Sequence, residues 1–66
     1  MIVYFENEGS PLTVDTIELA HNCAKSTMID SDLDTLRYCV IDFDNMTSKM
    51  YIMKKSVSVS FSITEH

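Results

Sequence analysis

Apolar and polar side chains alternate strictly near the C-terminal end of the chain. From residue 56 to residue 64 every odd position is apolar and every even position carries a hydroxyl group. This period of two is typical of a strand with one buried face and one solvated face. The same phase extends back through Tyr51, so residues 49–64 are expected to be extended. They form either one strand, about 53 Å long at ~3.3 Å per residue, or two strands that bend at Lys54-Lys55.

Two further segments favour strands. Residues 2–6 begin with four successive apolar or aromatic side chains, and the turn-forming segment 7–11 that follows contains the only glycine and the only proline. Residues 35–44 are rich in β-branched and aromatic side chains and end on an Asp-Asn turn signal. Since residues 49–53 follow after a short loop, we predict an antiparallel hairpin between 35–44 and 49–53.

One amphipathic helix is predicted over residues 16–28, because apolar side chains recur there at steps of three and four. The apolar face comprises Ile17, Leu19, Ala20, Cys23, Ala24 and Met28. The opposite, exposed face comprises Glu18, His21, Asn22 and Lys25. Since alanine side chains are short, the two alanines indicate a close approach of the helix to a sheet.

Two helix starts are compatible with the sequence. Asp15 begins an Asp-Thr-Ile-Glu segment with the form of a capping box, in which case residues 12–14 are a short second strand. Alternatively, Ser10 caps a helix whose first residue is Pro11. We favour the first arrangement.

Together these elements predict an α+β fold. A single antiparallel β-sheet of four to five strands packs against one α-helix, in the order ββαβββ or βαβββ. Residues 1–66 form a single α+β domain, because a chain this short buries only about 60% of the surface that its unfolded form exposes. Met50 or Met53 is expected inside the core and Met46 in the loop of the hairpin.

Charge is distributed unevenly along the 66 residues, which carry ten acidic and five basic side chains and a net charge of −5. Residues 1–34 contain seven acids and one lysine, a net charge of −6, whereas residues 35–66 contain three acids and four basic side chains, a net charge of +1. This acidity disfavours direct binding of nucleic acid and favours encounter with a basic protein surface.

The chain is expected to be soluble and cytoplasmic. It starts without a secretory leader, and no window approaches the ~18 consecutive apolar residues that a membrane-spanning helix needs. In a reducing compartment the two cysteines, Cys23 and Cys39, are expected to pack as small apolar side chains rather than to form a disulfide.

No cofactor, metal or catalytic site is predicted. The histidines and cysteines lack the spacing of zinc ligands. The acidic segment that begins at Asp30 is similar to the start of a calcium loop, but Thr35 stands where that loop requires glycine and Ile41 where it requires glutamate. His21 lies two positions from Cys23, which favours an exposed histidine beside a core cysteine over a catalytic pair. The chain is therefore not expected to be an enzyme.

Two functional hypotheses follow. The first is a small acidic protein-binding module that inhibits or modulates another protein, and the expected target is a basic or nucleic-acid-binding protein. In size and charge the chain resembles accessory proteins that phages encode to block host enzymes. The second is a self-associating structural or scaffold subunit, a homodimer joined through its C-terminal strand. The candidate protein-binding residues are Glu6, Glu8, Asp30, Asp32, Asp34, Tyr51, Val57, Val59 and Phe61.

Overall fold

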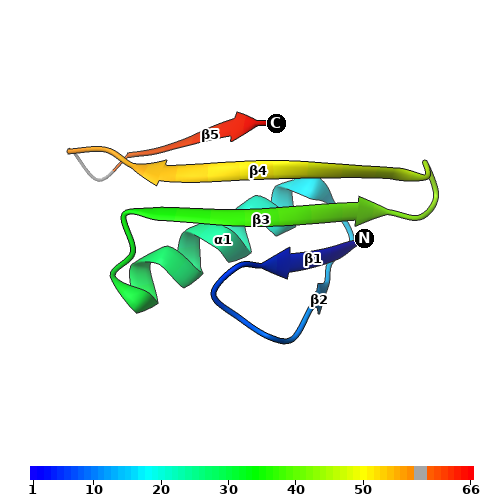
Figure 1. The fold of residues 1–66 in the computed structure, drawn as a ribbon, viewed down its shortest axis with the longest axis horizontal. Coiled ribbons are helices and arrows are strands. Elements are labelled where there is room, and N and C mark those ends of the chain that lie inside the picture. Colours follow the sequence, from blue (N-terminus) through cyan, green and yellow to red (C-terminus); the bar gives the residue numbers. More distant parts are fainter. Residues whose placement is uncertain (58–59) are drawn as a thin grey trace.

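A single helix packs against one face of an antiparallel sheet (Figure 1). The computed structural model describes residues 1–57 and 60–66, and within them the sheet has five strands in the order β2-β1-β3-β4-β5. In chain order the elements are β1 (Ile2–Phe5), β2 (Leu12–Thr13), α1 (Ile17–Ser31), β3 (Thr35–Asp42), β4 (Thr47–Lys55) and β5 (Phe61–Glu65). The predicted α+β class is confirmed, with the ββαβββ order.

The hairpin of β3 and β4 is the central pairing of the sheet. The predicted antiparallel hairpin is confirmed, and its ladder runs from Thr35 opposite Lys54 to Asp42 opposite Thr47, so that β4 begins two residues before the predicted 49. The connecting loop is held by the Asp42 carboxylate, which accepts hydrogen bonds from the backbone N–H groups of Asp44 and Asn45 and from the Asn45 amide. These bonds, the Asn45 side-chain bond above all, lower the pKa of Asp42.

The helix begins one residue later than predicted. Thr16, not Asp15, is the N-cap, and its hydroxyl oxygen accepts a hydrogen bond from the Leu19 N–H at 3.2 Å. The reason is that the chain stays tied to the sheet as far as Val14, whose N–H donates to the carbonyl of Met1 at 2.9 Å. Asp15 is therefore used in turning the chain, and the capping box does not form.

The core lies between α1 and the sheet. Its buried side chains are Val3, Phe5, Val14, Ala20, Ala24, Met28, Leu36, Tyr38, Val40, Tyr51 and Met53. Both alanines are fully buried, which confirms the close approach of helix and sheet. Met53 is inside, whereas Met50 is 47% exposed and Met46 lies in the hairpin loop, as expected.

His21 is on the buried side of α1, contrary to the prediction that it lies on the exposed face. The buried stripe follows Ile17, Ala20, Ala24 and Met28 at steps of three and four, and His21 falls beside it, half-buried. Leu19 lies off the stripe and is 44% exposed. The true helix face is thus rotated from the predicted one, because histidine was counted as polar and leucine as apolar.

The C-terminal segment forms two strands rather than one. β4 ends at Lys55, near the predicted bend, and β5 begins at Phe61 and pairs antiparallel with β4. Ser56 closes the connection by donating its backbone N–H to the carbonyl of Ser60 at 2.8 Å. The prediction that residues 56–64 are extended throughout is therefore wrong at Ser56, Val57 and Ser60, which lie in this connection, whereas residues 58–59 lie outside the described residues.

Candidate interaction surface

The second face of the sheet is not covered by any described helix or strand. In Figure 1, α1 passes behind the sheet, so the viewer looks onto this uncovered side, which we call the open face. Successive side chains of a strand point to opposite sides of a sheet. The side chains that point away from α1 in the three inner strands are Ile2, Tyr4, Arg37, Cys39, Ile41, Ser48, Met50, Ile52 and Lys54.

The register of the strands arranges these side chains in rows across the open face. One row places Tyr4 beside Cys39 and Cys39 beside Met50, and the neighbouring row places Ile2 beside Ile41. Tyr4 is 46% exposed and Met50 is 47% exposed, whereas Ile2, Cys39 and Ile41 are half-buried by neighbouring side chains of the sheet. Cross-strand neighbours of this kind lie within contact distance, so the rows form a continuous apolar surface.

A row of mixed charge borders the apolar rows. Glu6 continues the ladder beyond β1, because its N–H donates to the carbonyl of Arg37 at 3.0 Å, and Arg37 in turn lies opposite Ile52. Both Glu6 and Arg37 line a shallow hollow with Tyr4, Cys39 and Met50. Although they are neighbours, Glu6 and Arg37 do not form an ion pair with each other in the free chain, as far as the described residues show.

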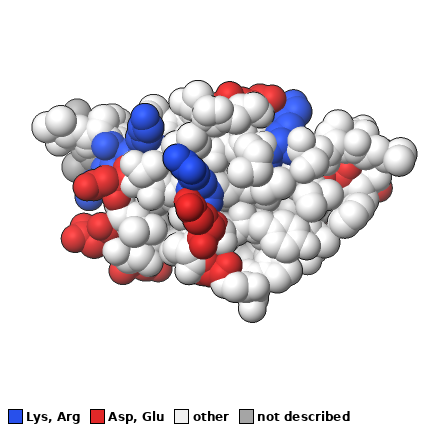
Figure 2. All heavy atoms as spheres, viewed as in Figure 1, with Lys and Arg blue, Asp and Glu red and all other residues white. Residues whose placement is uncertain are grey.

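Most charged side chains lie outside the apolar rows. Figure 2 looks onto the open face and shows few charged atoms in the half nearest the β3–β4 loop, whereas acidic and basic side chains are frequent near the middle, towards the other end and along the rims. The loop itself adds two exposed apolar side chains, Phe43 at 64% and Met46 at 92%. Met46 also has a φ of 54°, a left-handed conformation that side chains other than glycine rarely adopt.

An aromatic cluster lies beneath the sheet, on the side of α1. The ring of Tyr38 stacks on Tyr51 with centroids 5.5 Å apart, and His21 meets both rings edge-on. The Nδ1 atom of His21 is 2.7 Å from the Tyr38 hydroxyl oxygen. Burial lowers the pKa of His21. Burial, with the nearby Tyr51 as a smaller cause, raises the pKa of Tyr38 to about 12. Both groups are thus held neutral at pH 7, which suits a link between helix and sheet.

The structure separates the predicted site residues. Glu6 and Glu8 lie on the connection between β1 and β2, and Asp30, Asp32 and Asp34 lie together at the C-terminal end of α1. Val57 is fully exposed in the turn after β4, and Val59 lies outside the described residues. Tyr51 is only 7% exposed, and the half-buried Phe61 packs against the core with the Lys25 ammonium 5.5 Å from its ring centroid.

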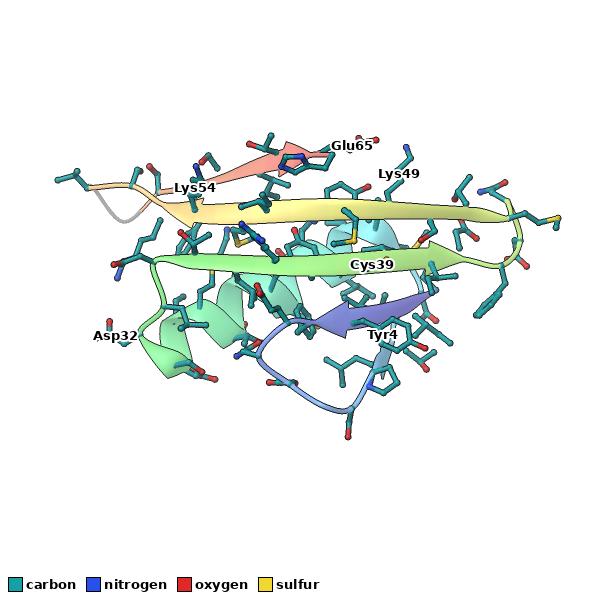
Figure 3. The ribbon with its side chains drawn as sticks, in the orientation of Figure 1. Tyr4, Asp32, Cys39, Lys49, Lys54 and Glu65 are labelled. Carbon is teal, nitrogen blue, oxygen red and sulfur yellow. The ribbon has the colours of Figure 1, made fainter. Side chains whose placement is uncertain are left out.

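The acidic end of α1 lies at the same end of the molecule as Lys54 and Lys55. The N–H of Lys55 donates to the carbonyl of Asp34 at 2.9 Å, and Figure 3 shows Asp32 and Lys54 at this end. Basic side chains at the same end of the molecule reduce the local negative potential. The three aspartates are therefore less suited to attract a basic partner than their sequence alone indicated.

The open face was not predicted from the sequence, although the sequence contains a signal for it. The runs Ile2–Phe5 and Tyr38–Ile41 are apolar without a break, apart from a small cysteine. A continuous apolar run is typical of a strand with both faces buried. A chain with one predicted helix can cover only one face of its sheet, so the other apolar face requires a partner or remains exposed.

Neither metal-binding chemistry nor membrane insertion finds support in the described part of the chain. Within residues 1–57 and 60–66, no three His, Cys, Asp or Glu side chains lie where they could hold a metal ion together. Cys23 and Cys39 are both free thiols. Over the same residues no helix has the length and apolar character required to cross a membrane. Comparison with protein families, with curated proteins and with solved structures finds no match.

Proposed function

We propose that this chain is a non-enzymatic protein-binding module and that the open face is its docking surface. One observation carries the proposal: the central strands present cross-strand rows of apolar side chains on a face that nothing in the described chain covers. A module that covers this face with another protein would act as an inhibitor or modulator by occupying the surface of its target.

The energetics of burial support this assignment. Removing apolar surface from water contributes about 25 cal/mol per Å², so covering ~400 Å² of side chain contributes on the order of 10 kcal/mol before the costs of association. Tyrosine and methionine, which are enriched at the centres of interfaces, are the most exposed members of the central row, as Tyr4 and Met50. Contiguous apolar patches on a protein surface frequently mark interaction sites.

The two surfaces that the sequence suggested receive less support. The aspartates at the end of α1 lie at the same end of the molecule as Lys54 and Lys55, and a cluster of acidic side chains does not by itself define a binding site. The outer edge of β5 offers five residues, of which Glu65 is tied to Lys49 by an ion pair of 3.3 Å. Such a short edge buries far less area than a sheet face.

Site-specific photo-crosslinking tests the proposal. A benzophenone side chain is placed at Tyr4 on the open face and, as the matched control, at Leu19 on α1, because the two positions are 46% and 44% exposed. After irradiation in cells of the source organism, we expect Tyr4 to give one discrete protein adduct that Leu19 does not give. The adduct should disappear in a Met50→Glu background. Equal adducts at both positions, or none at either, would contradict the proposal.

A further inference from the structure

We infer that the protein on the open face is a second copy of this chain, packed face to face about a two-fold axis that runs parallel to the strands between β1 and β3. The inference rests on the proposed function, because it names the occupant of the same surface. Three properties of the open face lead to it: its area, the pairing of its apolar rows and the positions of its two opposite charges.

The open face has the area that a stable homodimer needs. The longest extents of the domain are 36 Å and 21 Å, and these are the two dimensions of the view in Figure 1. A rectangle of this size covers about 750 Å², which is the outline of the whole domain and therefore an upper limit for the open face; a standard interface takes ~800 Å² from each partner. The edge of β5, only five residues long, cannot approach this value.

The apolar rows of the open face match each other across the proposed axis. Rotation about a line between β1 and β3 places β1 of one copy over β3 of the other and keeps each row opposite itself. Tyr4 then faces Cys39 of the second copy, a large side chain opposite a small one, and Ile2 faces Ile41. Packed sheets are rotated by roughly 30°, so these contacts are closest at the centre of the interface and diagonal at its ends.

The charges of the open face select this axis. Glu6 and Arg37 occupy one row on β1 and β3, so the rotation places Glu6 of each copy over Arg37 of the other. An axis along β3 would instead place Arg37 over Arg37. An axis across the strands, through the row of Cys39, would place the charged row over the row of Ile2 and Ile41. Of these three arrangements, only the first places Glu6 and Arg37 of each copy opposite a side chain of opposite charge.

The remaining net charge does not oppose this packing. The helix layer carries acids such as Glu18 and Asp30, and it lies on the far side of the sheet from the open face. In the dimer the two helices face outward on opposite sides. The acidic side chains of the two helices are therefore separated by both sheets. Their repulsion is screened, because the Debye length is only about 8 Å at physiological ionic strength.

A charge-swap series tests the inference by measuring mass in solution. We expect the wild-type chain to sediment as a species of about 15 kDa, twice the 7.5 kDa of one chain. Arg37→Glu and Glu6→Arg each place like charges across the axis and should give monomers, whereas the double variant E6R/R37E should restore the dimer. Lys25→Glu makes the same change of charge on α1 and should stay dimeric. Circular dichroism confirms that each variant is folded.

Cysteine reactivity supplies a second measurement that does not disturb the charges. Cys39 is half-buried on the open face and is covered by Tyr4 of the second copy in the proposed dimer. In a Cys23→Ala background, its alkylation by maleimide should slow at least several-fold as the protein concentration rises through the dimerisation range. A rate that is independent of concentration would overturn the inference.

The outcomes separate the inference from the proposed function. A wild-type chain that is monomeric up to ~1 mM, together with a Tyr4 adduct to a different protein, overturns the homodimer and leaves the docking surface in place. A monomer without any Tyr4 adduct overturns both. A dimer that persists in both single charge variants overturns the proposed axis.

Discussion

Replacing Tyr38 by phenylalanine removes one hydroxyl group from the centre of the core and tests how helix and sheet are joined. The ring is 1% exposed, and its hydroxyl lies 2.7 Å from Nδ1 of His21. The ring itself is retained in Tyr38→Phe, so its packing on Phe5 and Tyr51 is preserved. One net hydrogen bond is lost, which at pH 7 should lower the free energy of unfolding by about 1 kcal/mol.

The same hydroxyl makes the folded protein sensitive to alkali. The pKa of Tyr38 is about 12 in the folded chain, against an ordinary value of 10. Between these values the unfolded chain releases the proton and the folded chain keeps it, so stability falls as the pH rises. If the Tyr38 hydroxyl group is fully desolvated, the free energy of unfolding should fall by about 1.4 kcal/mol by pH 11 and by slightly more than about 2 kcal/mol by pH 12. Residual hydration of the hydroxyl group makes both of these losses smaller.

Wild type and Tyr38→Phe are therefore expected to change order of stability as the pH rises. Tyr38→Phe is less stable than the wild type at pH 7, but it does not lose stability through ionisation of this hydroxyl group. The two free energies of unfolding should therefore converge as the pH rises and cross at about pH 11 or above. Urea titrations followed by circular dichroism at 222 nm, repeated from pH 7 to pH 11.5, measure the difference. Two curves that stay parallel across this range would refute the account of the Tyr38 environment.

Three further predictions concern single positions. Asp32 ends α1 at a φ of 53° and places an acid at the negative end of the helix dipole. Asp32→Gly should therefore raise the free energy of unfolding, measured in urea, by about 0.5–1 kcal/mol. The control Asp34→Gly should not raise it. Met53→Ala should lower the free energy of unfolding by about 2–5 kcal/mol, because Met53 is fully buried. Met50→Ala should lower it by less than about 1 kcal/mol in the monomer, because Met50 lies on the open face. Equal losses would contradict a sheet with one buried face and one open face. The pKa of His21 is lowered on folding, so the unfolded chain binds a proton more readily than the folded chain. The free energy of unfolding should therefore fall as the pH drops below 6.5. His21→Gln should make this dependence on pH weaker.

The elements of the fold were predictable where one local pattern dominated. The β-branched and aromatic content of the hairpin strands and the step of three and four in the helix predicted the presence and type of β3, β4 and α1 correctly. The boundary errors arose where distant contacts compete with local preference. The bond from Val14 to Met1 moved the helix cap to Thr16, and the antiparallel pairing of β5 with β4 divides the C-terminal segment into two strands.

The candidate surface depended on information that no local pattern contains. Apolar side chains at Tyr4, Cys39 and Met50 are visible in the sequence, but their assembly into one row requires the register of three strands. The placement of Glu6 beside Arg37, 31 positions later, is likewise set by the pairing of β1 with β3.

The sequence by itself determined the element types, the acidic balance and the presence of more apolar strand surface than one helix can cover. The tertiary structure alone decided which of the two faces α1 covers, that His21 joins the buried aromatic cluster and that Glu6 lies beside Arg37 on the uncovered face. The physical reason is that backbone geometry and side-chain polarity act over a few residues. Strand order and helix placement are instead set by the burial of the chain as a whole.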